Sequence, residues 1–149
     1  MSLARLLNDQ QGRLAALVTL LEEELEALTA GQIDGSRLER IATEKQALLA
    51  ELEGMEQLRR QVQRRLGYRD GHEGARAAAR DADCLAGWEA TLGATERADR
   101  LNRLAGQLLG MRLAHNQRML DFIHEVSEKT LYDPRGRTGR QPGRLNASA

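Results

Sequence analysis

The residues of this chain that could carry catalysis or hold a metal are three histidines and one cysteine: His72, His115, His124 and Cys84. A metal site needs several Cys, His or carboxylate ligands at short, regular spacing, and none of the four belongs to such a group. Cys84 has no histidine near it in the sequence that could serve as its base. We therefore expect no metal and no other cofactor, and we interpret the chain as a non-enzyme.

A group of arginines near the middle of the chain could instead contact phosphates. Residues 59–80 contain seven arginines and only two carboxylates. These arginines are Arg59, Arg60, Arg64, Arg65, Arg69, Arg76 and Arg80. The whole chain is nevertheless balanced at 22 basic and 22 acidic residues, and no recognition-helix motif is present. We expect solvent-exposed arginines at the end of a helical hairpin and no nucleic-acid partner; an RNA- or DNA-associated helical adaptor is an alternative.

The composition is typical of long helices. Of 149 residues, 41% are apolar, mostly Leu and Ala, 30% are charged and only 3% are aromatic. Sandwich and α/β domains need more aromatic and β-branched residues than this. A single cysteine suits a reducing compartment. Because the N-terminus becomes polar too early for a signal peptide, and no apolar run approaches the length of a membrane span, we expect a cytoplasmic protein.

Two helices are expected to form a hairpin. From Leu3 to Leu28 the apolar residues recur at the spacing of one helical stripe. The segment TAGQIDG interrupts this pattern, and the spacing of Ser36 and Glu39 fits a capping box that would start a second helix. Its stripe consists of Leu38, Ile41, Leu48, Leu52, Met55, Val62 and Leu66. A connection this short makes the two helices antiparallel neighbours.

Lys45 and Arg59 occupy positions of the second stripe that an apolar residue would normally fill. Charged residues in such a seam weaken it, which suits a bundle that must open or exchange partners. Their long aliphatic stems could equally pack along the seam while the charge reaches water.

A third helix is expected from Leu85 to about Thr130. Its apolar pattern runs through Leu85, Trp88, Leu92, Leu101, Leu104, Leu108, Met111, Met119, Phe122, Ile123 and Val126. Before it we expect a loop over residues 67–74 and a weak helix or mobile stretch over 75–84. Three glycines inside the third helix, Gly93, Gly106 and Gly110, indicate close backbone approach or local softness.

The C-terminal segment after the third helix is expected to be a flexible basic tail. Pro134 prevents the helix from continuing, and the tail carries four arginines against one aspartate. We therefore predict an all-α fold: an antiparallel hairpin with a long third helix and a flexible tail. The domain would cover residues 1–130, with helices at about 3–29, 36–66 and 85–130, and the tail residues 131–149.

The third helix should expose part of its apolar face. Two helices of similar length can cover one another, whereas the third is longer and continues directly into the tail. Methionine on such a face adapts to partners of more than one shape. This indicates a surface for a partner helix, although packing in a bundle core would also explain the pattern.

Three stretches resemble the FlgN family of flagellar export chaperones. LNRLAGQLLGMRLAHNQRML is similar to the family's L-N-x-x-N-G-x-L…N-Q-x-x-L signature, with Ala105 where the family usually has asparagine. The matching residues are Leu101, Asn102, Gly106, Leu108, Asn116, Gln117 and Leu120. GQIDGSRLERIATEKQALLAELE resembles a short turn followed by an E-K-x-x-L-L helix, matched by Glu44, Lys45, Leu48 and Leu49. TLYDPRGRT is similar to the family's helix-to-tail junction, with a Leu-Tyr pair before a turn that contains Gly136.

The resemblance implies a specific role. Members of the family are cytoplasmic helical chaperones that hold the C-terminal segments of the two hook–filament junction (hook-associated) proteins before export. They deliver these guests to the export gate, a membrane protein of the flagellar type III apparatus. The guest-binding region lies in the C-terminal half, and the tyrosine that Tyr132 matches is associated with docking to the gate.

We therefore expect guest contacts along the third helix and gate docking at its end. The expected guest contacts are Leu101, Leu104, Leu108, Met111, Met119, Phe122 and Val126, and the docking pair is Leu131 and Tyr132. The main alternative is a structural coiled-coil protein that self-associates through the same apolar stripes.

Overall fold

The computed structural model describes residues 2–131, and within them the side chains of residues 115, 116 and 127–131 are not described. Four helices follow one another along the chain: α1 (Leu3–Thr29), α2 (Gly35–Arg65), α3 (His72–Asp81) and α4 (Leu85–Leu131). No strand occurs among residues 2–131, which confirms the all-α class. In this same stretch no helix is both long and apolar enough to span a membrane.

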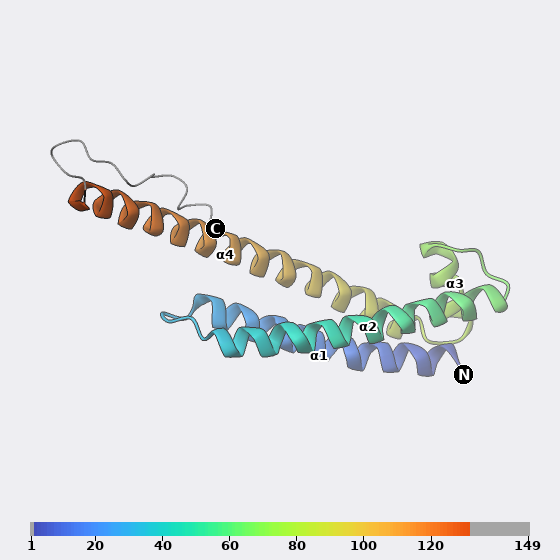
Figure 1. The fold of residues 1–149 in the computed structure, drawn as a ribbon. Helices are drawn as coiled ribbons and strands as arrows, with labels where there is room; N and C mark the ends of the chain where they lie inside the picture. The colour runs from blue at the N-terminus through green and yellow to red at the C-terminus, as the bar shows by residue number, and fades with distance from the viewer. Residues whose placement is uncertain (1, 132–149) are drawn as a thin grey trace. The chain divides into compact units, whose positions relative to one another are not determined.

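α1 and α2 lie side by side as an antiparallel hairpin (Figure 1). Each of the two helices has a side-chain cap at its start. The Ser2 hydroxyl accepts a hydrogen bond from the Arg5 amide at 3.2 Å. At α2 the Asp34 carboxylate accepts from the Arg37 amide at 3.1 Å. The expectation of a capping box at Ser36 was wrong, because Asp34 already satisfies a free amide of the first turn and α2 begins before Ser36.

α3 is a ten-residue helix in a stretch where the sequence predicted part of a loop and a weak helix. It forms because its small side chains pack closely: Ala75, Ala78 and Ala79 are buried against Leu3, Leu7 and Trp88. Gly71, just before α3, has a φ of +102°, which favours glycine. A Cβ on Gly74 would lie 1.8 Å from the Arg69 carbonyl oxygen, so only glycine fits there.

Residues 1–105 form one compact unit, in which the first part of α4 shares the core with the hairpin. One cluster joins the start of α1, α3 and Trp88. The second contains buried Leu17, Leu21 and Ala98, with Leu101 packed against them. α1 and α2 therefore do not cover all of one another's apolar surface. The expectation that they do was wrong. The described remainder of α4, from Gly106 to Leu131, belongs to a second unit.

The three glycines inside α4 are not sites of close backbone approach. A Cβ built on Gly93, Gly106 or Gly110 would meet nothing within 4 Å. Of the two alternatives for these glycines, close approach was therefore wrong, and local softness stays a prediction. α4 is continuous from Leu85 to Leu131.

Candidate functional site

Large apolar side chains are exposed along one side of α4, all but one of them in the second unit, and we call this side face A. Face A consists of Leu104, the last of these residues before the unit boundary, and of Leu108, Met111, Met119, Phe122 and Val126. These residues recur mostly every three or four positions, so they share one side of the helix. Met111 and Phe122 are 67% and 62% exposed. Leu108 is half-buried and the other members are also exposed.

A second apolar stripe, face B, lies on the same part of α4. It consists of Leu109, Leu113, Leu120 and Ile123, all of which are exposed. At 3.6 residues per turn, face B is rotated by about 120° from face A. None of its residues was among the predicted guest contacts. The signal was present in the sequence, because the intervals of four, seven and three residues fit a heptad pattern.

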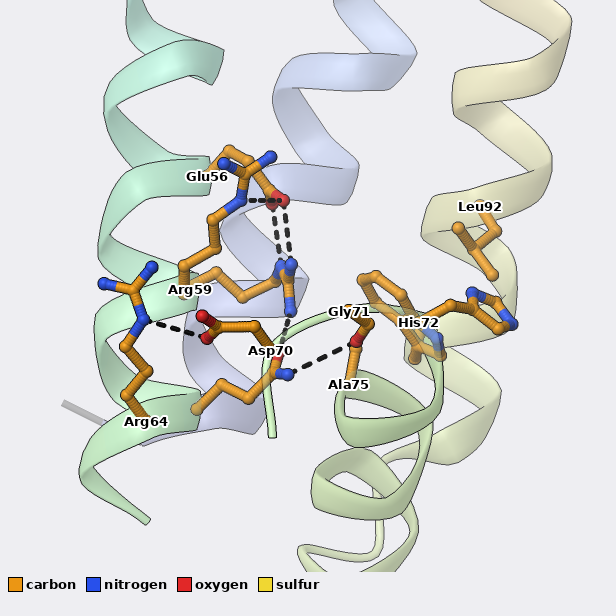
Figure 2. A pocket seen from close by; sticks show the side chains of 11 residues that line it. Glu56, Arg59, Arg64, Asp70, Gly71, His72, Ala75 and Leu92 are labelled. Atoms are coloured by element: carbon orange, nitrogen blue, oxygen red, sulfur yellow. Dashed lines mark hydrogen bonds and ion pairs between the residues drawn. The ribbon is translucent and has the colours of Figure 1, made fainter. Parts of the chain in front are cut away.

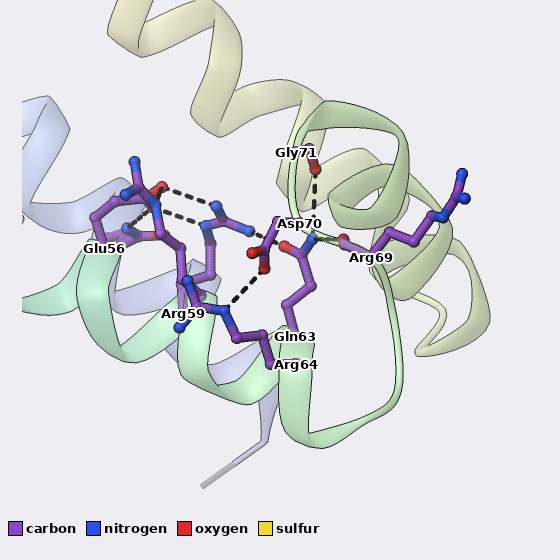
Figure 3. Close-up of polar contacts among 9 residues, drawn as sticks. Glu56, Arg59, Gln63, Arg64, Arg69, Asp70 and Gly71 are labelled. Carbon is purple, nitrogen blue, oxygen red and sulfur yellow. Dashed lines mark hydrogen bonds and ion pairs between the residues drawn. The ribbon is translucent and has the colours of Figure 1, made fainter.

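Arg59 of α2 is the centre of a network of polar contacts in the first unit (Figure 3). Arg59 is 6% exposed, and its Nε and Nη2 atoms donate to the two carboxylate oxygens of Glu56 at 2.7 and 2.8 Å. Its Nη1 atom donates to Gln63 Oε1 at 2.7 Å, and its guanidinium lies 4.6 Å from the ring centroid of Trp88. Gln63 in turn donates to the carbonyl oxygens of Arg69 and Gly71, which fixes the turn before α3.

The charged residues of the α2 stripe thus have matched partners. Lys45 Nζ lies 2.9 Å from Glu24 Oε1, in a pair whose side chains are only 18% and 15% exposed. Neither residue is an unmatched charge, since each pairs with a carboxylate. That the two charged residues weaken the hairpin relative to apolar ones stays a prediction. Partial burial raises the pKa of the Glu56 carboxyl, but hydrogen bonds and charges from Arg59, Gln10 and Arg60 outweigh it and hold the net pKa below its usual value.

A cavity of about 440 Å³ lies between α2, the start of α3 and α4 (Figure 2). Arg59, Arg60 and Arg64 line it from α2. Arg64 bridges to Asp70 at 2.8 Å, and His72 and Leu92 line the cavity from α3 and α4. Five of the seven arginines between residues 59 and 80 form ion pairs with carboxylates. Most of the positive charge that suggested phosphate binding is therefore compensated within the chain.

The thiol and imidazole groups show no catalytic arrangement within the described residues. Burial raises the pKa of the Cys84 thiol, and the nearby Asp83 carboxylate raises it further. A raised pKa lowers the fraction of reactive thiolate. His72 is stacked at a tilt on Trp88, with ring centroids 6.3 Å apart. No group of three or more His, Cys, Asp or Glu side chains among the described residues could hold a metal ion.

Comparison with known proteins gives the family. The family model described as "FlgN protein" matches residues 1–140. The chain belongs to the FlgN family. It is 35% identical to the flagella synthesis protein FlgN of Salmonella typhimurium over 136 residues, which are 91% of this chain and 89% of that protein. It is 31% identical to the flagella synthesis protein FlgN of Escherichia coli over the same shares. No solved structure matches the chain.

Membership in the FlgN family confirms the resemblance. The predicted contact residues differ in how exposed their side chains are. Leu104, Met111, Met119, Phe122 and Val126 are exposed on face A, and Leu108 is half-buried there. Leu101 is half-buried and packs with Leu17, Leu21 and Ala98 in the core of the first unit. Leu131 ends α4 and its side chain is not described, and Tyr132 lies outside the described residues. The docking pair therefore stays a prediction.

Proposed function

We propose that this chain is a flagellar export chaperone. It binds the C-terminal segments of hook-associated proteins, prevents their premature association or degradation, and delivers them to the export gate. Membership in a family whose relatives are named flagella synthesis proteins supports the flagellar role. The exposed apolar side chains of faces A and B carry the binding part of the proposal.

The physical basis is that amphipathic guest helices can cover these faces, one helix on each, because the faces lie about 120° apart on α4. Burying a fully exposed large apolar side chain contributes about 1.5–3 kcal/mol, so a half-exposed one contributes roughly 1 kcal/mol. The ten residues of the two faces then provide on the order of 10 kcal/mol, and the guest's own apolar side adds a similar amount. Association costs about 4–15 kcal/mol, which leaves a complex that protects the guest and can still release it. The methionines adapt the surface to more than one guest.

Guest binding is tested by isothermal titration calorimetry with the isolated C-terminal segments of the hook-associated proteins. Phe122→Glu places a charge on face A at one of its most exposed residues, and we expect about a tenfold or greater loss of affinity. Ala114→Glu is the matched control, because Ala114 is exposed and lies on neither face. Equal affinities of the two variants would show that face A does not hold the guest.

Docking to the export gate is assigned to Leu131 and Tyr132, the Leu-Tyr pair at the helix-to-tail junction. We expect Tyr132→Ala to leave helicity and guest binding intact and to weaken association with the gate protein in a pull-down. A collapse of the circular dichroism signal would instead make Tyr132 a core residue and remove the docking assignment.

Self-association is the second candidate, because two apolar stripes on one helix also fit a multi-stranded bundle. Sedimentation velocity separates the two functions. The chaperone proposal expects a monomer or small oligomer that forms a complex of defined mass when a guest segment is added. A large assembly that excludes the guest would favour the structural role.

A further inference from the structure

α4 consists of two parts whose side chains differ in burial. In the first part, Trp88, Thr91, Ala98 and Ala105 are at most 7% exposed. The described side chains of residues 106–126 are all exposed or half-buried. Ala105 is also the last residue of the first compact unit. The burial of described α4 side chains therefore ends where the first unit ends, and we call the stretch from Gly106 to Leu131 the second part of α4.

The polar contacts of α4 change at the same point. Side chains of α1 and α3 bond to its first part. Three such contacts are Gln11 Nε2 to the Gly87 carbonyl oxygen at 3.1 Å, Arg76 to Glu89 at 2.9 Å and Arg97 to Glu22 at 2.7 Å. In the second part, Gln117 Nε2 donates to Asp121 Oδ1 at 3.0 Å, a contact between consecutive turns of α4 itself. Such a contact stabilises a helix slightly and does not attach it to another element.

The second part of α4 has little helical stability of its own. Each residue added to an uncovered helix gains almost no free energy in water, because most helical stability in proteins comes from packing of an apolar face. Gly106 and Gly110 lower the stability further, since glycine loses the most backbone freedom on folding. Phe122, Ile123 and Val126 are weaker helix formers than Ala or Leu. This helix should therefore unwind readily while the first unit stays folded.

The glycines of α4 supply a matched set of positions for testing this. A Cβ on Gly106 or Gly110 would meet nothing within 4 Å, and neither residue belongs to face A or face B. Gly93 has the same open surroundings but lies in the part of α4 that belongs to the first unit. Alanine at any of the three positions therefore changes helix propensity without creating a clash.

We propose that the second part of α4 is a conformational switch. In the free chain its helix unwinds and re-forms independently of the first unit, and a guest on faces A and B holds it in the helical state. The role of the guest rests on the proposed chaperone function. Part of the binding free energy is then used to order the helix, which keeps the affinity moderate. Release of the guest can begin by unwinding of α4 from its C-terminal end.

Hydrogen–deuterium exchange of the full chain, read by mass spectrometry, tests the switch without a guest. We expect the amides of residues 110–126 to be protected less than about a hundredfold relative to an unstructured peptide. The amides of residues 89–101 should be protected by at least about a thousandfold, because they open only when the first unit unfolds. Equal protection of the two stretches would overturn the proposal, since α4 would then unfold as one piece.

Alanine variants show whether helix stability in the second part sets its exchange. Replacing both Gly106 and Gly110 with alanine should slow the exchange of residues 110–114, the amides nearest to these positions, by about fivefold or more. Exchange of residues 89–101 should not change. Gly93→Ala is the control and should leave residues 110–114 unaffected. An equal effect of Gly93→Ala on residues 110–114 would contradict independent unwinding.

The guest arm of the experiment adds the C-terminal segment of a hook-associated protein. At a free concentration of about 100 times its Kd, it should slow the exchange of residues 110–126 by about a hundredfold. The variant with alanine at positions 106 and 110 should bind the guest several-fold more tightly, because less ordering remains to be done. A guest that binds in calorimetry without slowing this exchange would overturn the proposal. A guest that does not bind at all would instead refute the chaperone function, while the exchange of the free chain still decides whether the second part of α4 unwinds independently.

Discussion

Glu56→Gln tests whether the buried pair with Arg59 supports the first unit. The substitution keeps the shape of the side chain and removes the negative charge. Arg59 would then lie with its side chain 8% exposed and without its carboxylate, held only by Gln63 and the ring of Trp88. The expected effect is a loss of stability with no loss of helical structure.

The magnitude follows from the burial of the two partners. Removing one partner of a fully buried ion pair costs about 3–5 kcal/mol. The Glu56 side chain is 36% exposed, so solvent already screens part of the interaction, and we expect the free energy of unfolding to fall by about 2 kcal/mol. Glu51→Gln is the control, because Glu51 pairs with Arg13 between side chains that are 52% and 50% exposed. Its effect should stay below about 0.5 kcal/mol.

Urea denaturation followed by circular dichroism measures both variants. The pH dependence adds an independent readout, because the folded state holds the pKa of Glu56 below the ordinary value of a glutamate. A lowered folded pKa means that this stabilisation is fully present above the unfolded value and is lost as pH falls through the folded value. The wild-type chain should therefore approach the stability of Glu56→Gln only in acid, as the pH falls through the lowered folded pKa of Glu56.

Two results would refute this reasoning. A loss for Glu56→Gln no larger than that for Glu51→Gln would show that the pair is as weak as a surface pair. The double variant Glu56→Gln with Arg59→Met should be no less stable than Glu56→Gln alone, because the unpaired buried guanidinium is gone. A further large loss in the double variant would mean that Arg59 stabilises the fold without its carboxylate.

The remaining predictions concern backbone and thiol positions. Gly74→Ala should destabilise the chain by about 2 kcal/mol in thermal denaturation, because the new Cβ would lie 1.8 Å from the Arg69 carbonyl oxygen. Gly106→Ala should stabilise α4 by about 0.5–1 kcal/mol, since a Cβ there meets nothing within 4 Å; a loss of stability would mean that a contact is present. Iodoacetamide should alkylate Cys84 at pH 7 more slowly in the folded chain than in urea, because burial and Asp83 raise its pKa. Equal rates would contradict that assignment.

Some parts of the proposed binding surface could be read from the sequence. The spacing of the residues from Leu104 to Val126 identified face A, and most of its members are exposed. Leu101 was grouped with them because it falls in the same local pattern, yet it packs against Leu17 and Leu21. The sequence did not identify face B as a binding surface. An apolar stripe can be buried in one part of a helix and exposed in another, and the spacing of its residues does not show where the burial ends.

The sequence by itself determined the three long helices, the hairpin and the family, because helical periodicity, turn residues and motifs are local properties of the chain. It could not show that Asp34 caps α2, that α3 packs on Trp88, or that Arg59 and Lys45 lie beside carboxylates. Those features join residues that are close only after folding. Burial and charge pairing depend on which neighbours a side chain meets in space, and the tertiary structure alone decides this.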